Sequence, residues 1–173
     1  MKESTDAEFT AFVEQRAADL VRIAYAMTGD QRSAEDLVQA ALAKAYTRWP
    51  RIRGDAEPYV RRIIYHDRIS GWRRQARIRE FPMAEVPESS AGFGPGHDQD
   101  TTLRLTLRQA LLSLPPRQRA VLVLRYLEDR SVDETAEILG CRRGTVASQA
   151  TRALRKLREL VPDLDVTAPE VLR

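Results

Sequence analysis

The chain has 173 residues, which is enough for one ordinary domain or two small ones. Hydrophobic residues make up 43% and charged residues 31%, so the chain can bury a core and is not disordered throughout. Its longest apolar runs, Ile23–Met27 and Ala120–Leu124, hold five residues each, whereas a membrane-spanning helix needs roughly 20. The first residues contain no apolar signal segment. These features exclude a transmembrane or secreted protein, and we expect a soluble protein of a reducing compartment, the cytoplasm.

Cysteine and histidine are too scarce for the common metal and nucleophilic sites. Cys141 is the single cysteine, which excludes an internal disulfide and a zinc site built from cysteines. An enzyme would need a nucleophile, and Cys141 with His66 or His97 is the one conceivable pair. Because Cys141 directly follows a turn glycine, we favour a small buried turn residue instead. We therefore expect no metal, no cofactor and no catalytic residue.

The formal net charge of +3 is an average over blocks of opposite sign. Residues 1–43 carry a net charge of −4 and residues 44–79 a net charge of +8. Residues 80–103 carry −5, without any lysine or arginine, and residues 104–161 carry +6. Arginine richness alone could reflect a GC-rich genome. Two separate basic blocks, however, predict two surfaces for the phosphates of nucleic acid, with the acidic stretches facing something else.

Apolar residues recur at helical spacing along most of the chain, and no segment shows the convincing alternation of a strand. The spacing predicts a first helix over residues 6–27, which ends at Gly29 in a left-handed cap. A second helix is expected to begin near Asp30 or Ser33, since Ser33 and Asp36 have the spacing of a capping box. The pattern is that of an all-α protein.

The composition divides the chain into two small helical domains joined by a flexible acidic linker. A third helix, with a proline in its first turn, is expected to end near residue 79. Residues 80–103 contain three prolines and three glycines without an apolar period, which is typical of a linker; a loop docked on a neighbouring domain is the alternative. We therefore assign residues 1–79 to the first domain, 80–103 to the linker, 104–161 to the second domain and 162–173 to a short tail.

The second domain ends in the pattern of a helix-turn-helix. Two helices are expected between residues 103 and 127. Ser131 and Glu134 then form a capping box that begins a short helix, Gly140 turns the chain, and a last helix is expected over residues 143–160. The polar side of this last helix carries Arg142, Arg143, Thr145, Ser148, Gln149, Arg152, Arg155 and Lys156. Arginine and glutamine read guanine and adenine edges in the major groove, so this helix is predicted to bind DNA; a hairpin with a solvated basic face is the alternative.

Six short motifs together resemble a known family. They are GD at 29–30, AEDLVQ at 34–39, YVRR at 59–62, LPPRQR at 114–119, ETAEILGC at 134–141 and GTV at 144–146. The chain resembles bacterial RNA polymerase sigma factors of the extracytoplasmic-function (ECF) type over roughly Phe9–Arg158, in the sigma-E-like branch common in actinobacteria. The resemblance implies a protein that directs core RNA polymerase to specific promoters and helps to open the −10 region. Its implied partners are core RNA polymerase, promoter DNA and an anti-sigma factor, and the basic last helix would bind the −35 element.

The resemblance also implies roles for residues of the first domain. In the family, the helix that carries the AEDLVQ motif binds the largest polymerase subunit, so Asp36 and Gln39 would face the polymerase. Stabilisation of a helix dipole is the alternative for Asp36. The third helix would meet the −10 element, where the family captures an extruded base. Its implied DNA-binding residues are Arg61, Arg62, Tyr65, His66, Arg73 and Arg74, whereas Trp72 is either a further stacking plane or, as we favour, a core residue.

Some positions depart from the family pattern. His66 stands where asparagine is common, Arg68 where an aromatic residue is frequent, and Gly71 where tryptophan is frequent. Arg142 replaces a capping serine. A helix-turn-helix regulator that acts on duplex DNA without polymerase is the alternative function, but it leaves the N-terminal motifs without a role.

Overall fold

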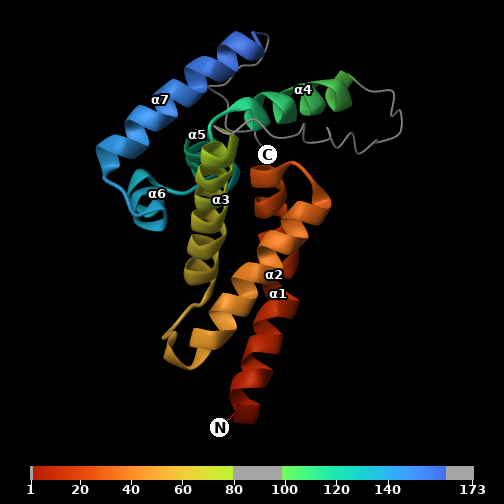
Figure 1. Ribbon diagram of the computed structural model, residues 1–173, viewed down its shortest axis with the longest axis vertical. Coiled ribbons are helices and arrows are strands. Elements are labelled where there is room, and N and C mark those ends of the chain that lie inside the picture. Colours follow the sequence, from red (N-terminus) through yellow and green to blue (C-terminus); the bar gives the residue numbers. More distant parts are fainter. Residues whose placement is uncertain (1, 80–98, 163–173) are drawn as a thin grey trace. The chain divides into compact units, whose positions relative to one another are not determined.

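The computed structural model describes residues 2–79 and 99–162, and these residues form helices and no strand (Figure 1). In chain order the elements are α1 (Lys2–Thr28), α2 (Gln31–Arg48), a 3₁₀ turn (Trp49–Arg51), α3 (Glu57–Arg79), α4 (Gln99–Ser113), α5 (Pro116–Leu122), a π-helical turn (Val123–Leu127), α6 (Val132–Leu139) and α7 (Arg143–Leu160). The all-α prediction is confirmed. Most of the predicted linker lies outside the described residues.

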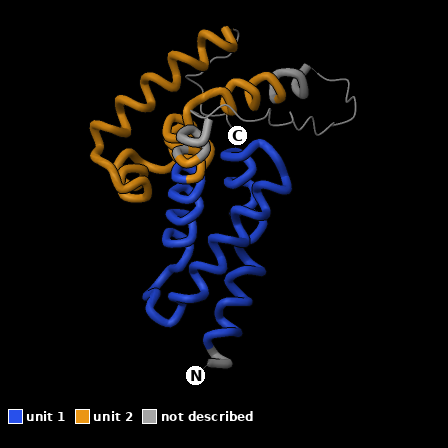
Figure 2. The backbone as a smooth tube through the Cα atoms, in the orientation of Figure 1, with its two compact units in different colours: residues 1–70 blue, residues 71–173 orange. Residues whose placement is uncertain are grey.

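The chain divides into two compact units, Met1–Ser70 and Gly71–Arg173 (Figure 2). The division falls inside α3, between Ser70 and Gly71, although the helix itself continues unbroken from Glu57 to Arg79. A Cβ at Gly71 would meet nothing within 4 Å, so the glycine serves no close approach in the structure. Each unit has its own apolar core, as two small domains require.

In the first unit, α1 and α2 lie side by side and α3 completes the core (Figure 1). The buried residues are Leu20 and Ala24 of α1, Ala34, Val38, Ala41 and Ala45 of α2, and Val60 and Ile64 of α3. Three of the four buried residues of α2 are alanines, which leave room for the neighbouring helices to approach closely.

The turn between α1 and α2 differs in one detail from the prediction. Gly29 does adopt the left-handed conformation, with φ of 77°, and ends α1 as expected. The N-cap of α2, however, is Asp30, whose carboxylate accepts a hydrogen bond of 2.8 Å from the Ser33 amide. The capping box predicted from Ser33 and Asp36 is therefore wrong, because an aspartate three residues earlier already satisfies the exposed amide. Hydrogen bonding from Ser33 favours the charged carboxylate and so lowers the pKa of Asp30.

Aromatic rings join the first half of α1 to the end of α2. Phe9 packs edge-on against Tyr46 and Trp49, with both centroid distances at 5.0 Å, and Phe12 lies 5.1 Å from Trp49. The Tyr46 hydroxyl donates to Asp6 at 2.6 Å, and this hydrogen bond raises the pKa of Tyr46. The contacts hold the two helices together beyond their aliphatic core.

In the second unit, α4, α5 and α7 share a core around a buried arginine. The apolar members are Leu107, Ala110, Leu114, Leu122, Ala153, Leu157 and Val161. Arg119 of α5 is only 4% exposed, and its guanidinium donates to the carbonyls of Leu111 at 2.9 Å, Leu112, and Leu114 at 3.1 Å. Leu111 and Leu112 belong to the last turn of α4 and Leu114 directly follows it, where few backbone amides remain for the carbonyls; the Leu114 amide donates to Leu111 at 3.1 Å.

The helix that begins at Pro116 does not remain α-helical to residue 127 as predicted. It widens into a π-helical turn at Val123, and the Arg125 guanidinium donates to the Arg130 carbonyl just beyond that turn. A π turn leaves no sequence pattern that a period of 3.6 residues would detect.

Replacing Arg119 by alanine should destabilise the second unit by about 2–4 kcal/mol, because buried carbonyls would lose a charged donor. Arg117→Ala, at an exposed position of the same helix, should change the free energy of unfolding by less than about 0.5 kcal/mol. Amide hydrogen exchange in α4 and α5 would measure the second unit separately from the first. Equal protection in both variants would contradict this role for Arg119.

Candidate nucleic-acid interfaces

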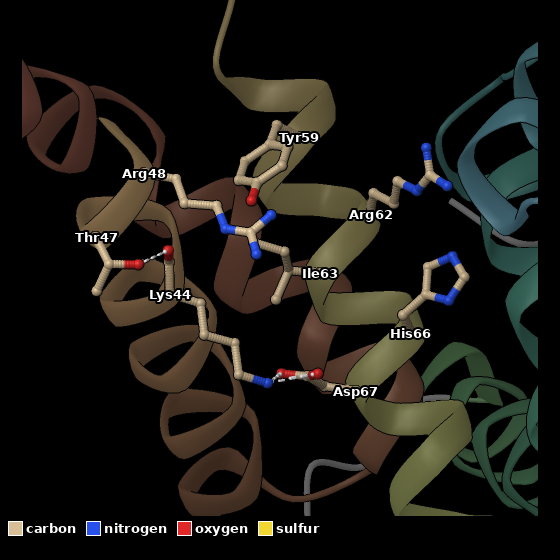
Figure 3. Close-up of a pocket in the computed structure, with 8 residues that line it drawn as sticks. All are labelled: Lys44, Thr47, Arg48, Tyr59, Arg62, Ile63, His66 and Asp67. Carbon is tan, nitrogen blue, oxygen red and sulfur yellow. Dashed lines mark hydrogen bonds and ion pairs between the residues drawn. The ribbon is translucent and has the colours of Figure 1, made fainter. Parts of the chain in front are cut away.

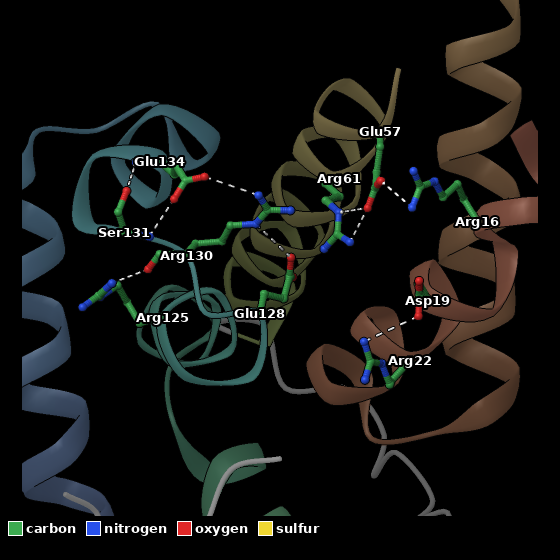
Figure 4. Close-up of polar contacts among 10 residues, drawn as sticks. All are labelled: Arg16, Asp19, Arg22, Glu57, Arg61, Arg125, Glu128, Arg130, Ser131 and Glu134. Atoms are coloured by element: carbon green, nitrogen blue, oxygen red, sulfur yellow. Dashed lines mark hydrogen bonds and ion pairs between the residues drawn. The ribbon is translucent and has the colours of Figure 1, made fainter. Parts of the chain in front are cut away.

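The helix-turn-helix of the second unit begins at a capping box (Figure 4). Ser131 Oγ accepts a hydrogen bond of 3.1 Å from the Glu134 amide, and Glu134 Oε2 accepts one of 2.8 Å from the Ser131 amide. These bonds favour the carboxylate form and lower the pKa of Glu134. At the other end of α6, Gly140 has φ of 61° and turns the chain towards α7. The predicted capping box of Ser131 and Glu134 and the predicted turn at Gly140 are both confirmed.

Small and apolar residues hold α6 against α7. Val121, Ala136 and Val146 are buried together, with Cys141 partly buried beside them. Burial raises the pKa of the Cys141 thiol, which is opposite to the change that activates a nucleophilic cysteine. The position is that of a small packing residue, as the sequence predicted.

The predicted DNA-binding residues of the second unit lie together on α7 and its N-cap. Val146, Ala153 and Leu157 face the core, whereas none of the eight polar residues is buried. Six of them are exposed, namely Arg142, Arg143, Ser148, Arg152, Arg155 and Lys156, and two are partly exposed, Thr145 and Gln149. The surface of this helix outside its buried stripe is therefore basic and rich in hydrogen-bonding groups.

An ion pair across the turn connects the two helices. Arg143 Nε lies 2.8 Å from Asp133 Oδ1, so the first residue of α7 meets the first turn of α6. Asp133 is not among the site residues predicted from the sequence. Only the angle between the two helices brings these residues together, since they are ten positions apart.

In the first unit, α2 and α3 enclose a pocket of about 460 Å³ (Figure 3). Its lining residues are Lys44, Thr47 and Arg48 of α2 and Tyr59, Arg62, Ile63, His66 and Asp67 of α3. Lys44 Nζ lies 2.7 Å from both carboxylate oxygens of Asp67 and so joins the two helices across the pocket. Because the pair of Lys44 and Asp67 has no net charge, the positive charge of the pocket comes from Arg48 and Arg62. Arg62 and His66 are one turn apart on α3, and both were predicted from the sequence; the contribution from α2 was not.

Two predicted DNA contacts on α3 are contradicted by burial. Arg61 is 7% exposed, and its guanidinium is bound by the Glu57 carboxylate, with Nε 2.8 Å from Oε1 (Figure 4). Glu57 is also 3.2 Å from Arg16 Nη1 of α1, so Arg61 belongs to an ion-pair network that ties α3 to α1. Tyr65 is fully buried and presents no stacking plane. Both had been assigned to DNA from the family resemblance, which carries over a position in the sequence and not the burial of its side chain.

Further along α3, Trp72 is 44% exposed, so the core position favoured for it is wrong. Arg74 is exposed, and the side chain of Arg73 lies outside the described residues.

Arg68, which stands where the family often has an aromatic residue, donates from Nε to the Met27 carbonyl at 3.3 Å. It closes the C-terminal end of α1, and its partial burial lowers its pKa.

Asp36 and Gln39 are both exposed on α2, away from the buried Ala34 and Val38. Asp36 is the sixth residue of α2, and the first turn of this helix contains no acidic residue. Because the helix dipole acts mainly within the first turn, stabilisation of the dipole does not account for Asp36.

Comparison with known families identifies both units. Residues 12–78 match the family model described as Sigma-70 region 2, and residues 104–157 match the model described as Sigma-70, region 4. The chain belongs to the sigma-70 family. The RNA polymerase sigma-E factor of Streptomyces coelicolor is 39% identical over 167 residues, which cover 94% of the chain and 92% of that relative. The sigma-E factor of Streptomyces avermitilis is 37% identical, covering 93% and 89%. This protein is thus an RNA polymerase sigma factor of the sigma-E type in the ECF group.

A solved structure supports the same assignment. The sigma factor RpoE, in a complex with the anti-sigma factor NepR from Bartonella quintana, is similar with a TM-score of 0.66 and 25% identity, over 91% of this chain and 98% of that one. The pocket of the sigma factor lies within its region 2, and α7 lies within its region 4. Within the part of the sigma factor that the structure describes, no helix is both long and apolar enough to cross a membrane.

The capping box makes the helix-turn-helix of the sigma factor sensitive to acid. Because the pKa of Glu134 is lower in the folded state than its ordinary value of 4.5, its contribution to stability is present above that pH and is lost as the pH falls through the folded-state pKa. Glu134→Gln should therefore destabilise the second unit at neutral pH and cost progressively less below pH 4.5. Glu137→Gln, at an exposed position of the same helix, is the matched control. Hydrogen exchange in α6 across this range would measure the difference, and a cost independent of pH would contradict it.

Proposed function

We propose that this sigma factor contacts the −35 element through α7 and holds an unpaired base of the −10 element in the pocket between α2 and α3. Directing core RNA polymerase to promoters requires both contacts, because one places the complex on duplex DNA and the other stabilises the opened strand. The single observation that carries most weight is that eight polar and basic residues on α7 and its N-cap are all unburied, while Val146, Ala153 and Leu157 of the same helix are buried.

The exposed side of α7 has the chemistry of a major-groove reader. Arg143, Ser148 and Gln149 offer hydrogen bonds to base edges, and the N-terminal part of a recognition helix is the part that meets the bases. Arg155 and Lys156 lie nearer the C-terminal end, where flanking phosphates are the expected partners. The buried Val146, Ala153 and Leu157 keep the helix on its unit with this side turned outward.

The pocket of the first unit has the chemistry of a base-binding site. Arg48 and Arg62 would neutralise backbone phosphates, the ring of Tyr59 would offer a stacking plane, and His66 would offer a ring nitrogen. Its volume of about 460 Å³ lies within the range of known ligand pockets. These residues replace Arg61 and Tyr65 in the set proposed from the sequence, while Arg62, His66, Arg73 and Arg74 remain in it.

The exposed Asp36 and Gln39 of α2, which lie within the net-acidic residues 1–43, are the proposed contacts for core RNA polymerase. An acidic surface suits a protein partner better than DNA, whose phosphates would repel it. We further propose a cytoplasmic, non-enzymatic role, and regulation by an anti-sigma factor, as the RpoE–NepR complex supports.

Opening of the −10 element should depend both on core polymerase and on the pocket. Arg62→Ala should reduce permanganate reactivity of −10 thymines in the holoenzyme–promoter complex by about tenfold, which corresponds to the loss of one charged hydrogen bond. Arg22→Ala, an exposed arginine of α1, should leave it unchanged. Strand opening by the protein without polymerase would contradict the proposal and favour a regulator that acts alone.

Arg155 should hold phosphate and read no base. Arg155→Ala should weaken binding of the holoenzyme to all −35 sequences alike and reduce the slope of log K against log salt by about 1. Titrations on two promoters that differ in the −35 element, at several salt concentrations, would measure both quantities. A change in preference between the promoters would show that Arg155 reads a base.

A further inference from the structure

The ion pair between Asp133 and Arg143 is placed where the recognition helix begins. Arg143 is the first residue of α7, and Asp133 is the second residue of α6. Arg143 Nε lies 2.8 Å from Asp133 Oδ1, although the two side chains remain 73% and 65% exposed. A pair this open to water contributes little to the stability of a fold. The effect of the pair is instead on the orientation of the Arg143 side chain.

The ion pair with Asp133 involves only one side of the Arg143 guanidinium. A guanidinium has five N–H donors in a planar fork, and Nε is the nitrogen that lies beside the Asp133 carboxylate, 2.8 Å from Oδ1. The two terminal amino groups remain available as a parallel pair of donors. Guanine presents two acceptors, O6 and N7, on its major-groove edge, and a parallel pair of donors is what binds them both. A side chain already held in one orientation also loses less conformational freedom when it binds.

The carboxylate also makes Arg143 a poor phosphate clamp. The pair carries no net charge, and Asp133 would repel a phosphate that approached closely. Arg142 differs, because the described residues provide no carboxylate partner for it, so it keeps its full charge beside the turn. Two adjacent arginines thus have different electrostatics: Arg142 suits the DNA backbone and Arg143 suits a neutral base edge.

We propose that Asp133 is a positioning residue, which orients Arg143 to read one guanine of the −35 element. The inference rests on the proposed role of α7 in −35 binding. The more ordinary role for an acid in the first turn of α6 is to stabilise that helix, alongside the capping box of Ser131 and Glu134. A purely stabilising acid would affect folding but would leave base preference unchanged, and this difference makes the two roles separable.

Binding selection by the holoenzyme on a promoter library with a randomised −35 element would test the proposal. Arg143→Ala should abolish the preference for guanine at one position, a loss of roughly 5- to 150-fold in discrimination. Asp133→Ala should reduce discrimination at that same position by at least about threefold, without weakening binding to other sequences. Asp133→Asn keeps an acceptor oxygen and should retain more of the preference. Glu137→Gln removes the same charge from the same helix and should behave as the wild type.

The double variant separates positioning from an independent contact. If Asp133 acts through Arg143, Asp133→Ala should have no further effect on base preference once Arg143 is alanine. Wild-type preference in Asp133→Ala, or a change at a different base position, would overturn the proposal while leaving −35 binding by α7 intact. If the wild-type holoenzyme selects no −35 sequence at all, the proposed function itself fails together with this inference.

Discussion

The satisfaction of carbonyls at the C-terminal ends of helices is the constraint on which the second unit depends. Pro115 and Pro116 end the helical ladder after α4, and the buried Arg119 guanidinium donates to three carbonyls at this end, those of Leu111, Leu112 and Leu114. Because Arg119 belongs to α5, this contact sets the position of α5 on α4. α5 packs in turn against α7, so the placement of the basic side chains of α7 depends on a buried arginine of another helix.

Arginines in this protein therefore have two distinct roles: some stabilise the fold, and others remain exposed to solvent. Arg68, Arg119 and Arg125 donate to carbonyls at or just beyond helix ends, and Arg61 is bound by the Glu57 carboxylate inside an ion-pair network. The arginines of α7 and Arg62 of the pocket remain exposed. A basic block in the sequence thus overstates the charge available to nucleic acid, because part of that charge holds the fold together.

The helix-turn-helix was predictable because its signals are local. Ser131 and Glu134 are three residues apart, and Gly140 provides its own left-handed turn, so each works without distant partners. The unburied positions of α7 were predictable from the helical period of 3.6 residues. The pocket was predictable only in part: Arg62 and His66 come from one face of α3, but Lys44 and Arg48 come from α2, and no spacing within one helix relates the two sets.

Motifs, caps and periodicity along the chain were sufficient to predict the family, the all-α class, the approximate helix ranges and the order of regions 2 and 4. The burial of Arg61 and Tyr65, the exposure of Trp72 and the meeting of Asp133 with Arg143 across a turn became visible only in the folded chain. The physical reason is that periodicity defines a face relative to the axis of its own helix. Which neighbour covers that face, and which opposite charge comes within hydrogen-bonding distance of it, depends on the angles at which helices pack.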